Sequence, residues 1–228
     1  MNQKTAMKLF GLLGLLMLLS CGYADRHRNS SSCEQALVDS LEVRVQDSLF
    51  SNVHYSRSQL LEALTQTQDS LVYYRLLALY GKTFFVSSDF DSILYYNRRV
   101  KEFSRNASQS SESLQSPRWN DVLSDVYNIE GNVWMQLNRP DSAIIDYKKA
   151  YGYRLEGKKL HLLPDICINI ADAYLHRSDL AHTASYYRRA LFLCDSLNLS
   201  DLPKSYSNRK YFHCHQCNVC GLSERTIT

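Results

Sequence analysis

The sequence is poor in the two residues that build most tight turns. Only 8 glycines and 4 prolines occur among 228 residues, which disfavours an all-β fold because such a fold needs many turns of that kind. An excess of one charge is also missing: the formal net charge is +3 at pH 7, and no basic stripe of the kind that binds nucleic acid is present. With 45% hydrophobic and 21% charged residues, the chain has the composition of a globular protein.

The sequence also lacks the motifs of the common enzyme classes. It contains no nucleophile elbow, no phosphate-binding loop and no HExxH zinc motif, and no pair of carboxylates is placed for acid–base chemistry. We therefore interpret the chain as a protein that is not an enzyme and needs no cofactor.

Residues 1–20 have the pattern of a secretory signal peptide. Lys4 and Lys8 supply a charged start, and the apolar run that follows is about a dozen residues long, shorter than the ~20 that span a bilayer. The run ends in Leu-Leu-Ser-Cys, which resembles the lipobox of bacterial lipoproteins. That resemblance implies that Cys21 carries acyl chains such as palmitate and anchors the protein in a membrane. The alternative is an ordinary signal peptide with an unrelated cysteine.

The residues after Cys21 are polar and rich in serine, and we predict that residues 21–33 form a flexible tether. Gly22 stands where lipoproteins retained at the inner membrane have aspartate. The resemblance therefore implies a lipid-anchored protein of the cell envelope, at the outer membrane rather than the inner one.

Three stretches of the chain share one pattern of small and aromatic residues. In the middle stretch a glycine and a tryptophan are followed by two alanines that flank a tyrosine, at helical spacing. Related residues recur at the same offsets fifty residues earlier and forty residues later. The three sets are Gly81, Phe84, Ile93, Asn97 and Val100; Gly131, Trp134, Ala143, Tyr147 and Ala150; and Ala171, Tyr174, Thr183, Tyr187 and Ala190. Such a repeat predicts an all-α fold of stacked helix hairpins.

The repeat also predicts how the chain is divided. We expect hairpins over residues 70–103, 118–157 and 164–197, within a repeat region that covers 70–202. Pro117 and Pro164 fall at the expected starts of first helices, where proline is tolerated. Residues 34–69 are predicted to form an N-terminal helical cap, in which Ser56 and Gln59 fit a capping box. Residues 104–116 are expected to be a mobile loop or a frayed helix end.

The pattern resembles the tetratricopeptide repeat, which the middle copy matches at all five positions. The resemblance implies a right-handed superhelix of antiparallel helix hairpins, whose concave face holds a peptide or a partner protein. Members of the family are scaffolds without chemistry of their own. The chain departs from the family in its spacings of fifty and forty residues against thirty-four, in its missing terminal proline, and at Ile93, Asn97, Val100 and Thr183.

Candidate binding residues are polar side chains of the first helices that the repeat core does not use. They are Asn128, Asn132, Gln136, Asn169, Asp172 and Arg177. A row of amides can bind the backbone of a peptide, but the same row would also suit a helix face that only meets solvent. Both interpretations stay open at this point.

The last residues hold three cysteines at steps of three, next to two histidines. Cys214, Cys217 and Cys220 could coordinate zinc or begin an iron–sulfur site. The alternative is that residues 203–228 are an atypical tail, disordered or a repeat that begins at Pro203 and is lost by truncation or a frameshift. Cys167 and Cys194 could form a disulfide in an exported protein, or could be buried thiols.

Together these patterns predict a membrane-anchored scaffold without enzymatic activity that binds proteins or peptides at the cell envelope. By analogy with longer proteins of this family, the chain could be the sensory part of a signalling or regulatory protein, or a truncated relative of one. One alternative is a glycan- or nutrient-binding lipoprotein of the cell surface. Another is a truncated gene product without independent function. We expect no nucleic-acid partner.

Overall fold

The computed structural model describes residues 36, 38–45, 52–107 and 116–199. The predicted signal peptide (1–20), tether (21–33) and tail (203–228) lie outside these residues. Within the described ranges the chain forms helices and short connections, and no strand occurs there, so the predicted all-α fold class is confirmed. Across the same ranges, no helix combines the length and the apolar character that crossing a bilayer requires.

The chain divides into two compact units, residues 1–86 and 87–228. The described part of the first unit contains helical residues 38–45, α2 (Val53–Gln66) and α3 (Ser70–Lys82). The short 3-10 helix η1 (Thr83–Ser87) follows α3 and ends at the first residue of the second unit. Apolar side chains of the three helices form one buried cluster: Val38, Leu41, Val45, Leu60, Ala63, Val72 and Leu76. The residues predicted as an N-terminal cap therefore share a core with α3.

The start of α2 differs from the prediction. Asn52, not Ser56, caps the helix, because the Asn52 side chain accepts a hydrogen bond from the Tyr55 backbone N–H at 3.1 Å. Ser56 lies within the first turn, and its hydroxyl donates to the Asn52 carbonyl oxygen. The predicted capping box of Ser56 and Gln59 was wrong, because an equally good capping residue stands four positions earlier.

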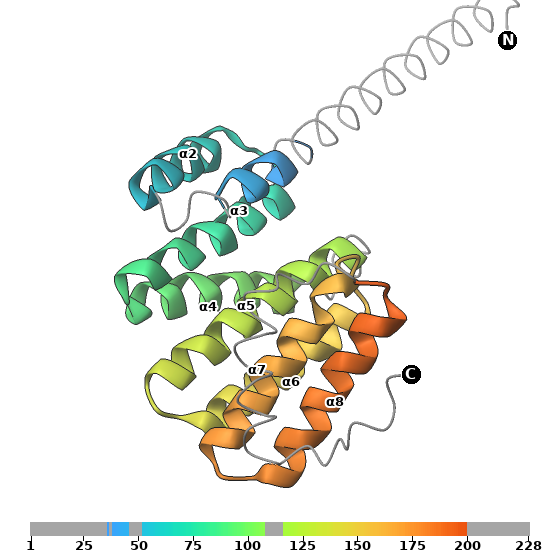
Figure 1. Ribbon diagram of the computed structural model, residues 1–228. Coiled ribbons are helices and arrows are strands. Elements are labelled where there is room, and N and C mark those ends of the chain that lie inside the picture. The colour runs from blue at the N-terminus through green and yellow to red at the C-terminus, as the bar shows by residue number, and fades with distance from the viewer. Residues whose placement is uncertain (1–35, 37, 46–51, 108–115, 200–228) are drawn as a thin grey trace, which may run out of the picture. The chain divides into compact units, whose positions relative to one another are not determined.

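The second unit contains α4 (Phe90–Ala107), α5 (Pro117–Gln136), α6 (Pro140–Leu155), η3 (Leu160–Leu162), α7 (Leu163–His176) and α8 (Leu180–Ser196). Neighbouring helices in the sequence pack on each other: α4 on α5, α5 on α6, α6 on α7, and α7 on α8 (Figure 1). Short turns fold α6 back on α5 and α8 back on α7. The helix α4 continues through residues 104–107, which we had expected to lie in a loop or frayed end.

The turns that precede α4, α6 and α8 repeat with the spacing found in the sequence. Ser88, Asn138 and Ser178 have positive φ angles of 54°, 56° and 58°, and they are separated by the same fifty and forty residues. Each stands two residues before a helix, since α4, α6 and α8 begin at residues 90, 140 and 180. A left-handed residue commonly follows the end of a helix, and a fourth one, Asn198, follows α8. Three of the four therefore recur at the spacing of the sequence pattern.

Most residues of the sequence pattern lie where the helices meet. Gly81, Gly131, Ala143, Tyr147, Ala150, Ala171, Tyr174 and Ala190 are buried, and Phe84, Trp134 and Tyr187 are partly buried. Gly131 shows why a small residue is needed: a Cβ atom built there would lie 2.4 Å from Cε1 of Tyr147. The tyrosine ring thus fills the space that the glycine leaves between α5 and α6.

Candidate binding face of the repeat hairpins

Two of the predicted amides meet between neighbouring hairpins. Asn169 on α7 donates a hydrogen bond from Nδ2 to Oδ1 of Asn128 on α5, at 3.0 Å, and both side chains are partly buried. Within the described part of the chain, Asn128 Nδ2 and Asn169 Oδ1 have no partner. Exchanging nitrogen and oxygen in both amides would still leave one donor and one acceptor. The pair therefore offers the two groups that bind one peptide unit.

Two other predicted binding residues instead join the two helices of their own hairpin. The Tyr147 hydroxyl donates to Oδ1 of Asn132 at 2.7 Å, and the Tyr187 hydroxyl donates to Oδ1 of Asp172 at 2.5 Å. Asn132 and Asp172 are forty residues apart, as are the two tyrosines, so the same contact occurs in both hairpins. The premise that the repeat core leaves these two side chains unused was wrong, because a buried tyrosine needs a hydrogen-bond partner. Burial also raises the pKa of Tyr187.

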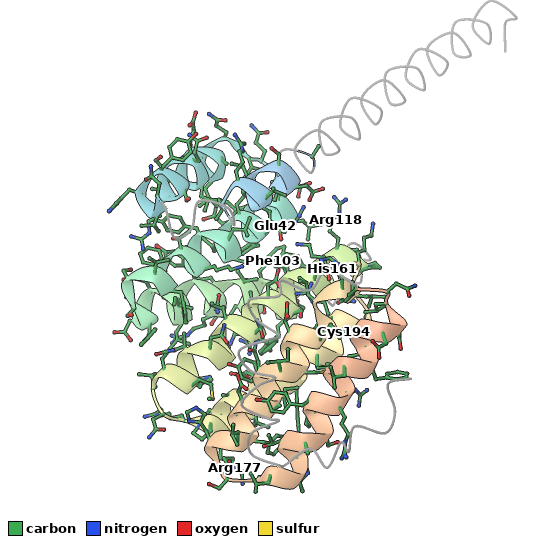
Figure 2. The ribbon with its side chains drawn as sticks, viewed as in Figure 1. Glu42, Phe103, Arg118, His161, Arg177 and Cys194 are labelled. Atoms are coloured by element: carbon green, nitrogen blue, oxygen red, sulfur yellow. The ribbon has the colours of Figure 1, made fainter. Side chains whose placement is uncertain are left out.

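The remaining two candidates lie at the ends of the first helices. Gln136 is the last residue of α5 and is exposed. Arg177, labelled in Figure 2, follows the last residue of α7 and pairs with the exposed Asp141, with 3.0 Å between Nη1 and Oδ1. The candidate binding face is thus defined by Asn128, Asn169 and Gln136, with Arg177 at its edge.

A buried ion network that the sequence did not reveal joins α5 to the end of α6. The Arg154 side chain is 1% exposed, and its guanidinium contacts Asp121 at 2.7 Å and also Asp125. Asp121 accepts further hydrogen bonds from the backbone N–H groups of Lys158 and Lys159. Because Asp125 is paired with Arg154, its charge is compensated on this side of α5. No motif marks Arg154 in the sequence, since its partners stand about thirty residues away.

A second charged cluster lies between α4, α5 and α6. Glu130 is 3% exposed, and its carboxylate oxygens lie 2.6 and 2.7 Å from Nζ of Lys101. Burial raises the pKa of Glu130, although the Lys101 ammonium opposes that shift. On α6, Asp146 accepts a hydrogen bond from Nε1 of Trp134 at 2.8 Å. Every member has a partner inside the fold, which marks this as a structural cluster.

The two cysteines of the third hairpin are free thiols. Cys167 on α7 is fully buried, and burial raises its pKa to about 12. Cys194 on α8, labelled in Figure 2, is partly exposed, and burial also raises its pKa. A thiol with a raised pKa is a poor nucleophile because the thiolate is the reactive form.

The predicted lipidation and metal residues cannot be placed. Cys21, Cys214, Cys217 and Cys220 all lie outside the described residues. Within residues 36, 38–45, 52–107 and 116–199, no group of three histidine, cysteine or carboxylate side chains is arranged to hold a metal ion. A scan against protein-family models and a search of the curated proteins both found no match for this sequence.

Proposed function

We propose that the protein is a scaffold of the tetratricopeptide-repeat type, held at the cell envelope by a lipid on Cys21, that binds an extended peptide segment of a partner protein. The Asn128–Asn169 pair carries this proposal. It joins the first helices of two neighbouring hairpins, and it offers one hydrogen-bond donor and one acceptor side by side. A membrane anchor would hold the binding face close to partners in the envelope.

The repeat geometry supports the assignment of this fold type. Left-handed turn residues recur at the spacing of the sequence pattern, and Gly131 admits a buried aromatic ring in the way a small residue of this repeat would. Tyr147 and Tyr187 also make equivalent contacts in consecutive hairpins. The spacings of fifty and forty residues exceed the family's thirty-four, which longer helices and connections would explain.

The chemistry of the pair favours a peptide backbone as ligand. A peptide unit has one N–H donor and one C=O acceptor. The amide pair supplies an oxygen that can accept from the N–H and an N–H that can donate to the C=O. Each such hydrogen bond contributes about 0.5–1.5 kcal/mol net, so the two together give about 1–3 kcal/mol, and the pair alone would bind more weakly than a millimolar Kd, which requires about 4 kcal/mol. Tighter binding needs further contacts along the same face, and Gln136 lies on the same helix as Asn128.

Site-specific photo-crosslinking tests the proposal. A photoreactive residue at Gln136 should capture an envelope protein in intact cells. The matched control places the same residue at Ile145, which is 57% exposed on α6, and should not capture that protein. Equal capture at both positions, or none at either, contradicts the proposed face. A glycan array with the purified protein examines the other candidate: binding to glycans without a protein partner would replace our proposal.

A further inference from the structure

Two interfaces between helices at equivalent positions of the repeat use different chemistry. Lys101 on α4 and Tyr151 on α6 are fifty residues apart, and Glu130 on α5 and Ile170 on α7 are forty apart, so each pair of residues occupies one position of the repeat. Where α4 meets α5, Lys101 forms an ion pair with Glu130. Where α6 meets α7, Tyr151 packs on the apolar cluster that contains the fully buried Ile170.

The ion pair is enclosed by groups from three helices. The Glu130 side chain is 4% exposed and that of Lys101 is 24% exposed. From α6, Asp146 and Lys149 face the same site and form their own contact, with 3.2 Å between oxygen and nitrogen. Tyr127 on α5 lies under both ammonium groups, with Lys101 Nζ 5.2 Å and Lys149 Nζ 5.0 Å from the centre of its ring. Each charge in the cluster has an opposite charge beside it.

Such a pair adds little to stability. Removing two charges from water costs about as much as their attraction returns, and apolar residues of similar volume often do as well or better. The α6–α7 interface shows that this repeat position accepts an apolar pair in the same protein. The charged pair at α4–α5 is therefore not required for helix packing as such.

The ion pair does distinguish the correct neighbouring helix from an incorrect one. If α4 packed on α7, Lys101 would be buried against Ile170 without a carboxylate. If α6 of another hairpin took the place of α4 on α5, Glu130 would be buried against Tyr151. Either exchange leaves a charge buried and uncompensated, which is strongly unfavourable. Similar hairpins within one chain are prone to exchange of this kind, within a molecule or between two copies.

We propose that Lys101 and Glu130 determine the pairing order of the helices, so that α4 accepts only α5 and hairpins of two molecules do not exchange. The ion pair destabilises incorrect helix pairings and adds little stability to the correct one. It depends on the repeat register alone and is independent of the peptide-binding proposal.

The test replaces the ion pair by an apolar pair in the full chain, purified in mild detergent. The variant is Lys101→Met/Glu130→Leu. The control is Arg98→Leu/Glu102→Leu, which removes the same two charges from exposed positions of α4. All three proteins are unfolded in urea, refolded over a range of concentrations, and examined by size-exclusion chromatography with light scattering.

We expect the apolar pair to keep or raise the urea midpoint, and to yield on the order of tenfold more swapped dimer than the wild type, a fraction that rises with concentration. The control should refold to the same species as the wild type. Three results overturn the proposal: a clearly lowered midpoint, which would make the pair a stabilising contact; a single wild-type-like species; or equal oligomer formation by the control. A disulfide trap between residue 101 of one copy and residue 170 of another would identify the exchanged dimer.

Discussion

Two glycine-to-alanine substitutions should change stability in opposite directions. Gly131 lies inside α5, and a Cβ atom there would stand 2.4, 2.5 and 2.9 Å from three ring atoms of Tyr147. Favourable contacts between carbon atoms lie near 3.5–4.0 Å, so the ring or a helix must move by about 1 Å. Gly152 lies inside α6, and a Cβ atom there would meet nothing within 4 Å.

The magnitudes follow from two competing effects. Replacing glycine by alanine within a helix stabilises it by about 1 kcal/mol, and Gly152→Ala should gain most of this. At Gly131 the added methyl overpacks the core, which typically costs about 1–3 kcal/mol. The Tyr147 ring has little freedom to retreat, because it is 2% exposed and its hydroxyl is bonded to Asn132. We therefore expect Gly131→Ala to lose about 1–2 kcal/mol and the two variants to differ by about 2–3 kcal/mol.

Urea unfolding followed by circular dichroism measures both variants against the wild type. A third variant identifies the cause: in a Tyr147→Leu background, which is itself destabilised, Gly131→Ala should no longer lower stability, because the smaller side chain leaves room for the methyl group. If Gly131→Ala is as stable as Gly152→Ala, the close approach of α5 and α6 is not what requires a glycine, and the reasoning fails.

Three further predictions concern charge and attachment. Folding raises the pKa of Glu130, so its contribution to stability is present below the unfolded pKa near 4.5 and is lost as pH rises through the folded pKa. The free energy of unfolding should therefore fall less between pH 4.5 and 7.5 in Glu130→Gln than in the wild type. An unchanged pH profile of stability would contradict this. Asp121→Ala leaves Arg154 buried with Asp125 as its remaining carboxylate partner, and should lower the free energy of unfolding in urea by about 3 kcal/mol. A loss below about 1 kcal/mol would mean that water hydrates the Arg154 guanidinium in the variant. Cys21→Ser should abolish palmitate labelling and release the protein from the membrane fraction, whereas labelling that survives would exclude Cys21 as the anchor.

The sequence predicted that the described chain is helical, because helical periodicity depends on local spacing. Gly131 and Tyr147 are sixteen residues apart within one hairpin, and their pattern of size alone indicates that one fills the space beside the other. The all-α class followed from that pattern, together with the scarcity of glycine and proline. The left-handed residues were not predicted, because serine occupies two of the three positions and has no strong preference for that conformation.

The candidate binding face was only partly predictable, because it depends on contacts between residues far apart in the sequence. Asn132 and Asp172 look unused from their own helices, yet tyrosine hydroxyls of the following helices bind them. The partnership of Asn128 and Asn169 spans forty-one residues and requires the packing of α5 on α7 to be known. Arg154 was missed for the same reason, since its carboxylates lie on another helix.

The most direct test of the account is the affinity of the crosslinked partner for a protein that lacks the amide pair. Asn128→Ala/Asn169→Ala removes both amides together, so neither is left without its neighbour. Asn120→Ala on the same helix is the control, because the Asn120 side chain bonds to Glu156 and not to the pair. Isothermal titration with the captured peptide should show binding weakened about tenfold or more by the double variant and unchanged by the control. Equal affinity of the double variant and the wild type would show that the amide pair does not hold the ligand.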